Sequence, residues 1–236
     1  MSKPFQFKEF AIEQDQSAMK IGTDGVLLGA WVKLENEFSI LDLGTGTGVI
    51  SLMLAQRSNA EIIEAIEIDG PAFEQAVSNF ENSKWSDRLF CYHASLQEYA
   101  QEIDDTYDLI ISNPPFYTDA NPSKNKERAT ARFEDAMPFE HLTYAASKLL
   151  EPNGKFAVII PFKEEANFIK LAKQQSLLLN RVCRVQGTES SPVKRSLLEF
   201  SFTEKEIIKE NIIIEIERHV YTEAYKDLVK DFYLKM

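Results

Sequence analysis

The chain has 236 residues, of which 44% are hydrophobic and 27% charged, a composition typical of a globular domain and unlike that of disordered, collagen-like or coiled-coil proteins. Its two cysteines and three histidines are scattered, so neither a disulfide framework nor a metal site is expected. No secretory signal is visible, and no apolar run approaches the ~18 residues that cross a bilayer. We therefore expect a cytoplasmic protein with no membrane and no metal partner. We also expect a monomer, although no sequence feature encodes the oligomeric state.

The net charge of −11 is unevenly distributed along the chain. Residues 120–195 hold 13 basic and 8 acidic residues, a balance of +5, which leaves −16 for all other residues. An acidic protein repels nucleic acid overall, but a basic segment can still contact phosphates. The segregation is consistent with an RNA partner and also with ordinary solvated helix faces.

Ahead of the first expected strand, Thr23 is expected to cap a helix that runs through 25–33. Beyond it, short apolar runs alternate with segments of helical periodicity up to residue 160. The runs predict strands at 39–43, 61–68, 89–92, 107–111 and 155–160, and the segments between them predict helices at 49–57, 71–80, 96–102 and 139–150. Strict alternation implies right-handed crossovers, hence an α/β, Rossmann-like fold with a mostly parallel central sheet and helices on both faces.

The pattern changes after residue 160. A helix is expected at 163–175, followed by two strands at 179–186 and 197–202 that form an antiparallel hairpin at the sheet edge, a strand at 211–217 and a closing helix at 223–232. Gly154 fits a turn that enters the last parallel strand. No linker separates two large domains, so we expect a single domain over 1–236, with 1–37 ahead of the sheet, 38–162 as the core and 163–236 as its C-terminal part.

The first chemical motif is LDLGTGTG at 41–48, a strand that runs into a glycine-rich turn and then a helix. Gly44, Gly46 and Gly48 allow tight backbone dihedrals and close approach to a ligand. Asp42 precedes them, and a carboxylate there repels a diphosphate but attracts an ammonium group. The motif therefore favours S-adenosylmethionine (SAM) over NAD.

The second motif is an acid at the end of the next strand. Glu67 lies 23 residues beyond Gly44, close to the ~20 at which Rossmann-like folds place an acid for ribose hydroxyls. Asp69 is the competing candidate, and it also fits the cap of the following helix. We favour Glu67 because it closes the predicted strand.

The third motif is NPPFY at 113–117, directly after a buried strand. The Asn113 side-chain oxygen and the Pro114 carbonyl can both accept hydrogen bonds from one planar NH₂ group. Phe116 or Tyr117 then offers a face on which a planar ring stacks. This combination, after a SAM-type glycine turn, indicates methylation of an amino group.

The chain resembles a known family at these motifs and at three further ones. The NPPF motif after LDLGTGTG is similar to that of SAM-dependent amino-group methyltransferases. The block MKIGTDGVLLGAW at 19–31, the run Glu127-Arg128 with Ala131-Arg132, and Lys194-Arg195 resemble the bacterial valine-tRNA adenine-N6-methyltransferases over nearly the whole chain. The resemblance implies N6-methylation of an adenine in tRNA, most simply the one 3′ to the anticodon of tRNA(Val).

The resemblance also implies roles for individual residues. Residues 1–37 would cover the cofactor and 38–162 would form the SAM-binding core. The residues implied to hold SAM are Asp42, Gly44, Gly46, Gly48, Glu67, Thr23 and Asp24, and those implied to receive the target amine and its ring are Asn113, Pro114, Phe116 and Tyr117. Ser95 stands where many relatives carry an acid for the cofactor's adenine.

Two groups of cations are expected to flank the active-site mouth and to contact tRNA phosphates. The first group follows the NPPF loop and the second lies in the late hairpin: Lys124, Lys126, Arg128 and Arg132, then Arg181, Arg184, Lys194 and Arg195. Three alternatives stay open: guanine-N2 methylation of ribosomal RNA, glutamine-N5 methylation of release factors, and a module that binds SAM or RNA without turnover. The release-factor enzymes carry Tyr in place of Phe116 and an extra N-terminal domain.

Overall fold

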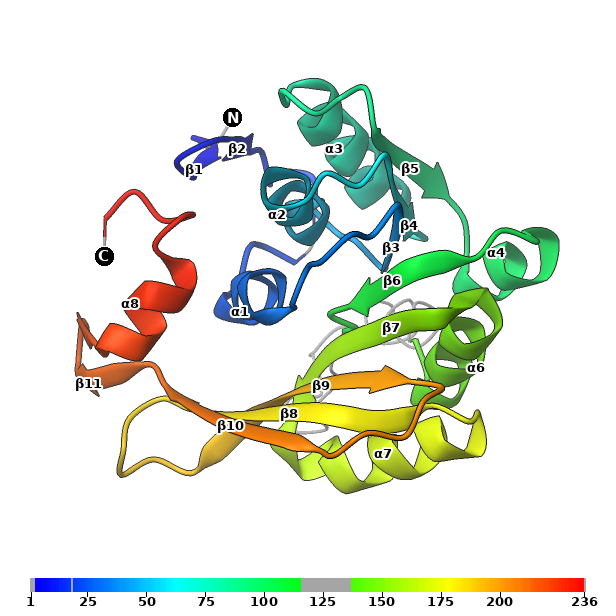
Figure 1. Ribbon diagram of the computed structural model, residues 1–236. Helices are drawn as coiled ribbons and strands as arrows, with labels where there is room; N and C mark the ends of the chain where they lie inside the picture. Colours follow the sequence, from blue (N-terminus) through cyan, green and yellow to red (C-terminus); the bar gives the residue numbers. More distant parts are fainter. Residues whose placement is uncertain (1–2, 18, 116–136, 236) are drawn as a thin grey trace, which may run out of the picture.

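The computed structural model describes residues 3–17, 19–115 and 137–235. Within them, eight strands form one sheet in the order β10-β8-β9-β7-β6-β3-β4-β5 (Figure 1). These strands are β3 (Ser39–Leu43), β4 (Ile62–Glu67), β5 (Leu89–His93), β6 (Tyr107–Ser112), β7 (Leu150–Pro161), β8 (Leu178–Gln186), β9 (Val193–Ser201) and β10 (Ile208–Ile213). Only β9 runs antiparallel to its neighbours in this sheet. The α/β prediction and its antiparallel hairpin are confirmed, and β10 adds one strand outside the hairpin.

Helices cover both faces of the sheet (Figure 1). One face carries α1 (Thr23–Trp31), α2 (Val49–Arg57), α3 (Gly70–Glu81) and α8 (Glu223–Val229), and the other carries α4 (Leu96–Glu102), α6 (Phe139–Leu149) and α7 (Glu165–Gln174). In β6, Leu109 and Ile111 belong to the core on the first face and Ile110 to the core on the second. The unbroken apolar runs of the sequence thus reflect strands that are buried on both sides.

The shortest strands are not predicted from the sequence. The hairpin β1 (Phe5–Gln6) and β2 (Ala11–Ile12), and the pair β11 (Glu215–Glu217) and β12 (Val220–Tyr221), have two or three residues per strand, too few for a period. The first hairpin lies near the C-terminal end of the chain, as Figure 1 shows, and Phe7 stacks on Tyr233 with ring centroids 5.8 Å apart.

Several boundaries differ from the prediction: α7 begins at Glu165 instead of 163, β9 begins at Val193 instead of 197, and α8 ends at Val229 instead of 232. Gly22, not Thr23, is the N-cap of α1, without a side-chain hydrogen bond, and Thr23 is the first helical residue. β7 begins at Leu150 instead of 155, because Leu150 already pairs with Tyr107 of β6. The ladder between the two strands is irregular from Leu150 to Lys155. Gly154 lies in that irregular stretch, where an added Cβ would sit 2.8 Å from the Tyr107 carbonyl oxygen, so close backbone approach explains the glycine. The predicted run 211–217 is divided between β10 and β11.

In the described part of the chain, no helix combines the length and the apolar character needed to span a membrane.

Candidate functional site

The glycine turn between β3 and α2 is built from left-handed backbone. Gly44, Gly46 and Gly48 have φ values of 74°, 57° and 80°, which side chains of other residues disfavour. The backbone N–H groups of Gly44 and Thr45 both donate to the Ile66 carbonyl oxygen at 3.0 Å. A Cβ on Gly48 would lie 2.5 Å from the Phe80 ring. The turn is therefore anchored to β4 and leaves no room for a side chain at its third glycine.

Asp42 lies beneath this turn and is fully buried. Its Oδ2 accepts hydrogen bonds from the hydroxyls of Thr45, at 2.6 Å, and Ser51, at 2.7 Å. Its Oδ1 has no partner among the described residues and is shielded from solvent. Burial raises the pKa of Asp42 to about 6, although the two hydroxyls oppose the shift. An incompletely compensated carboxylate thus sits under the turn and favours a cation above it.

Glu67 closes β4 and points back to the glycine turn. One oxygen accepts the Gly46 N–H at 2.8 Å, and the other accepts the N–H groups of Ile68 and Asp69, both at 2.9 Å. Burial raises the pKa of Glu67, and the three backbone donors partly offset this. Asp69 instead caps α3 by accepting the Ala72 N–H at 2.9 Å. Glu67 therefore contacts the glycine turn whereas Asp69 serves the helix cap, and the contact of Glu67 with ribose hydroxyls stays a prediction.

Asn113 follows β6 at the same edge of the sheet. The Ser112 hydroxyl donates to the Leu43 carbonyl oxygen at 2.8 Å and so ties the end of β6 to the end of β3, where the glycine turn begins. Asn113 is half-buried, and its side-chain nitrogen lies 3.8 Å from the position of a Cβ at Gly25. Pro114 is buried. Phe116 and Tyr117 lie outside the described residues.

The first turn of α1 lies beside Asn113 and is joined to β9. Asp24 accepts a hydrogen bond from Arg195 Nε at 2.7 Å, an ion pair between elements 171 residues apart. Arg195 lies level with Pro161 at the end of β7. The structure thus brings together a residue implied to cover the cofactor and one implied to contact RNA, which no local pattern indicates.

Ser95 and His93 lie at the next loop of the same edge. Ser95 is the N-cap of α4 in a capping box: its hydroxyl accepts the Glu98 N–H at 3.2 Å and donates to the Glu98 carboxylate at 2.7 Å. His93, level with Glu67 in the ladder, contacts the Ile68 carbonyl oxygen at 2.9 Å and stacks on Phe73. Sequence reasoning gave His93 no role, because its only signal is the last position of an edge strand.

The cations expected to contact phosphate fall into three groups. Lys194 and Arg184 are exposed, and Arg195 is partly exposed. Arg181 is buried at 5% exposure, pairs with Glu210 at 2.8 Å and lies 4.0 Å from the Trp31 ring, so its expected phosphate contact is wrong: it binds the sheet edge to α1. Outside the described residues lie Lys124, Lys126, Arg128 and Arg132.

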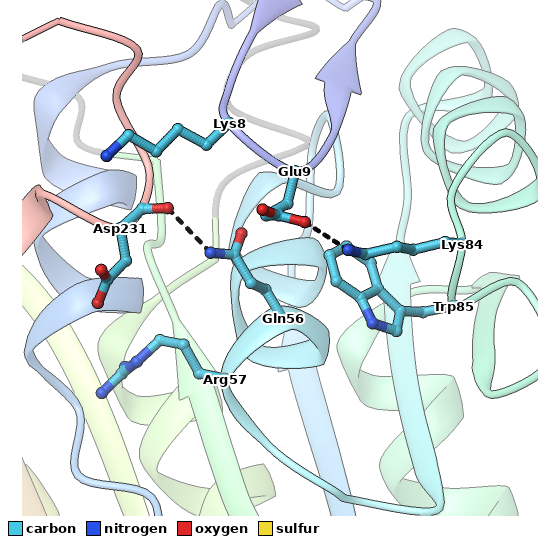
Figure 2. A pocket seen from close by; sticks show the side chains of 7 residues that line it. All are labelled: Lys8, Glu9, Gln56, Arg57, Lys84, Trp85 and Asp231. Atoms are coloured by element: carbon cyan, nitrogen blue, oxygen red, sulfur yellow. Dashed lines mark hydrogen bonds and ion pairs between the residues drawn. The ribbon is translucent and has the colours of Figure 1, made fainter.

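A separate cavity of about 590 Å³ lies at the far end of α2 (Figure 2). Its lining comes from the first hairpin, α2, the segment before β5 and the C-terminal segment: Lys8, Glu9, Gln56, Arg57, Lys84, Trp85 and Asp231. Lys84 pairs with Glu9 at 2.5 Å across it, and Gln56 donates to the Asp231 carbonyl oxygen at 2.9 Å. Because the glycine turn precedes the other end of α2, this cavity is distinct from the site described above.

Comparisons with known proteins agree with the geometry of the sheet edge. Residues 17–176 match the family model of the methyltransferase small domain. Among solved structures, the fold is similar to a "predicted O-methyltransferase" from Agrobacterium tumefaciens, with a TM-score of 0.70 and 20% identity over 89% of this chain and 96% of that one. It is also similar to the ribosomal protein L11 methylase of Lactobacillus delbrueckii, with a TM-score of 0.54 and 15% identity over 76% and 77%.

Curated relatives match over nearly their full lengths. The protein of Flavobacterium johnsoniae named tRNA1(Val) (adenine(37)-N6)-methyltransferase is 58% identical over 98% of this chain and 100% of its own. Proteins of the same name from Christiangramia forsetii and Bacteroides fragilis are 54% and 43% identical over 100% of this chain, and over 99% and 100% of their own lengths. With the glycine turn, Glu67 and Asn113 gathered at one sheet edge, the chain belongs to the family of tRNA1(Val) (adenine(37)-N6)-methyltransferases.

Proposed function

We propose that this protein transfers a methyl group from SAM to the N6 amine of adenine 37 in tRNA(Val), the adenine 3′ to the anticodon. The observation that carries the proposal is the placement of Asn113 and Pro114 beside the glycine turn, in a chain 58% identical to a relative of that name. The matched relatives and the methyltransferase fold support the class of reaction. The target base rests on the relatives' names.

The residues present suit a cofactor that is cationic at one end and carries hydroxyls at the other. Asp42 leaves one buried carboxylate oxygen without a partner under the turn, which favours an ammonium group above it. Glu67 accepts three backbone N–H groups, and the oxygen that accepts only the Gly46 N–H retains a lone pair for a ribose hydroxyl. Bound SAM would supply an electrophilic methyl group on its sulfonium. Thr23, Asp24 and Ser95 remain proposed contacts.

Asn113 and Pro114 prepare the nucleophile in this proposal. The N6 amine of adenine is a poor nucleophile because its lone pair is delocalised into the ring. Acceptance of its two N–H groups by the Asn113 side-chain oxygen and the Pro114 carbonyl draws the nitrogen toward tetrahedral geometry. The amine nitrogen would take the methyl group as the bond from that group to sulfur breaks, and would then lose one proton to water. Positioning and directed hydrogen bonds are therefore the main catalytic contributions, and no side chain has to act as a general base.

The base must leave the stack to reach Asn113, at a cost of a few kcal/mol that stacking on Phe116 or Tyr117 offsets. The basic segment around Arg128 and Arg132, together with Lys194, would hold the flanking phosphates. A single domain, a monomeric state and a cytoplasmic location belong to the same proposal. Light scattering on the purified protein tests the second of these.

The decisive experiment compares modified nucleosides with and without the protein. Purified enzyme and labelled SAM are added to total RNA and protein from cells that lack it, and the products are digested and analysed by mass spectrometry. We expect label in N6-methyladenosine of tRNA(Val) alone. Label in ribosomal guanine or in a release-factor glutamine would refute the proposal, and no label at all would favour a binding module.

Asn113→Ala sharpens this test. Because the side chain orients the amine and lies outside the glycine turn, we expect loss of at least about a hundredfold in kcat with SAM affinity within twofold of wild type. Asn180→Ala, which removes a buried amide that contacts Ser201 and Thr203 instead, is the matched control for stability. Equal loss of SAM affinity in Asn113→Ala would show that this side chain serves the cofactor rather than the amine.

A further inference from the structure

A buried carboxylate holds one arginine in a fixed orientation at the end of the hairpin. Glu165, at 9% exposure, accepts hydrogen bonds from Arg184 Nη2 at 2.7 Å and Nε at 3.2 Å. The Ser196 hydroxyl donates to the same carboxylate at 2.5 Å. The bonds lower the pKa of Glu165 although its burial opposes this, and they raise that of Arg184. The guanidinium is thus preorganised as a charged group.

The fixed guanidinium lies next to an exposed aromatic ring. Arg184 Cζ is 5.5 Å from the centroid of the Phe162 ring, within the range of a cation–π contact. The Arg184 side chain is 44% exposed and Phe162 is 38% exposed. Glu165 takes the Nε–H and one N–H of Nη2, and Nη1 has no hydrogen-bond partner among the described residues. Three of the five N–H groups therefore remain, and one on Nη1 and one on Nη2 point in parallel.

The register of the sheet places this pair at the same edge as Asn113. Ser112 of β6 lies level with Val158 of β7, and β7 continues three residues further, to Pro161, before Phe162. At ~3.3 Å per residue, this extension is about 10 Å. In the strand ladders, Arg184 of β8 pairs with Ser196 of β9, and Ser196 pairs with Ile160 of β7. The pair therefore stands beyond the catalytic strand end, on the side that carries α7.

We propose that Phe162 and Arg184 form a binding site for one nucleotide of the RNA substrate that flanks the methylated base. The base stacks on the Phe162 ring, and a phosphate takes the free N–H groups of Arg184. This inference rests on the proposed function. It adds a stacking contact at Phe162, which no sequence motif indicates, to the phosphate contact expected at Arg184. Exposed Lys194, two residues before Ser196 in β9, adds positive charge to the same surface, whereas Lys163 is paired with Glu164 at 3.8 Å.

The chemistry of the pair fits a nucleotide better than a peptide. Aromatic rings bind the face of any base, and a guanidinium with a fixed plane donates two parallel bonds to phosphate oxygens. An acidic peptide would match the arginine but would not use the ring. The Glu165 and Ser196 bonds also reduce the entropy that Arg184 loses when it binds.

The test measures tRNA affinity and turnover for variants at Phe162. Phe162→Leu keeps an apolar side chain without a ring, and Phe162→Tyr keeps the ring. We expect the Kd and the KM for a tRNA(Val) transcript to rise about tenfold in Phe162→Leu, to stay within twofold in Phe162→Tyr, and kcat and SAM affinity to stay unchanged in both. Phe90→Leu, 43% exposed on the opposite edge strand, is the matched control and should leave all four values unchanged.

Arg184→Ala provides an independent measurement. We expect weaker tRNA binding and a slope of log Kd against log salt reduced by about one, whereas Phe162→Leu leaves the slope unchanged. Arg218→Ala, at an exposed turn between β11 and β12, is the control. Should Arg184→Ala fail to fold because Glu165 loses its partner, the Phe162 variants decide alone.

The outcomes separate this site from the proposed function. If wild-type enzyme methylates no tRNA, the proposed function fails. If it methylates tRNA but Phe162→Leu binds tRNA as wild type does, only the nucleotide site is refuted. If Phe162→Leu lowers kcat or SAM affinity by the same factor by which it raises KM, Phe162 has a structural role and the nucleotide site is refuted. The site is also refuted if Phe162→Leu affects methylation of a protein substrate but not of tRNA.

Discussion

The two halves of the proposed active site are built from different interactions. On the cofactor side, the turn after β3 is held by backbone geometry, by hydrogen bonds from N–H groups to Glu67 and by a buried carboxylate at Asp42. On the substrate side, two ion pairs connect different elements: Asp24 with Arg195, both partly exposed, and the buried Glu165 with the exposed Arg184. The turn has no spare volume at Gly48, whereas the two ion pairs depend on charges that can be exchanged. Substitution of this glycine should therefore act through packing, and substitution of the paired side chains through electrostatics.

The largest effect on stability is expected at Gly48. Gly48→Ala places a Cβ on left-handed backbone, at about 1–2 kcal/mol, and against the Phe80 ring, at about 1–3 kcal/mol more. We expect the free energy of unfolding to fall by about 2–5 kcal/mol, measured by urea denaturation.

Gly46→Ala is the matched control, because its φ is 57° and an added Cβ would meet no atom within 4 Å. In Gly46→Ala the free energy of unfolding should fall only by the cost of the left-handed backbone, about 1–2 kcal/mol. Its Cβ would enter the open space above the turn, so SAM affinity should fall more than stability does. If both variants lose the same stability, the contact with Phe80 is not what requires glycine at 48.

The same difference between the halves explains what the sequence could predict. The glycine turn, Glu67 and Asn113 are local patterns at strand ends, and parallel topology brings such ends to one edge. The pairing of Asp24 with Arg195 depends on the register of β9 against β7, which composition does not encode. Arg181 looked equivalent to Arg184, yet strand alternation turns Arg181 toward Trp31 and Glu210, while Arg184 faces α7.

A pH dependence of about tenfold is expected for cofactor binding. Burial holds the pKa of Asp42 at about 6, above that of an exposed aspartate, so the carboxylate takes up a proton as the pH falls through 6. A ligand with an ammonium group favours the ionised form, and its affinity should therefore drop about tenfold between pH 7 and pH 5. Isothermal titration with S-adenosylhomocysteine measures this.

Methylthioadenosine distinguishes the contribution of Asp42 to this pH dependence from that of Glu67, because this ligand keeps the ribose but lacks the ammonium group. Its affinity should share any pH dependence that arises from Glu67 and should lack the additional tenfold loss. Asp42→Asn should remove that additional loss for S-adenosylhomocysteine and should stabilise the free protein, because a neutral amide avoids the cost of a buried charge. The same loss for both ligands would assign the pH dependence to Glu67 or to another group.

The smallest effect is expected for the ion pair between Asp24 and Arg195. Their side chains are 26% and 33% exposed, so a double-mutant cycle with alanine should give a coupling of about 0.5–1 kcal/mol in stability. The effect on tRNA affinity distinguishes two roles for Arg195. If Arg195 contacts phosphate, Arg195→Ala should weaken tRNA binding, whereas Asp24→Ala removes a competing carboxylate and should strengthen it. If the pair instead holds the first turn of α1 against Asn113, both variants should lower kcat alike, and the exchange Asp24→Arg with Arg195→Asp should restore it.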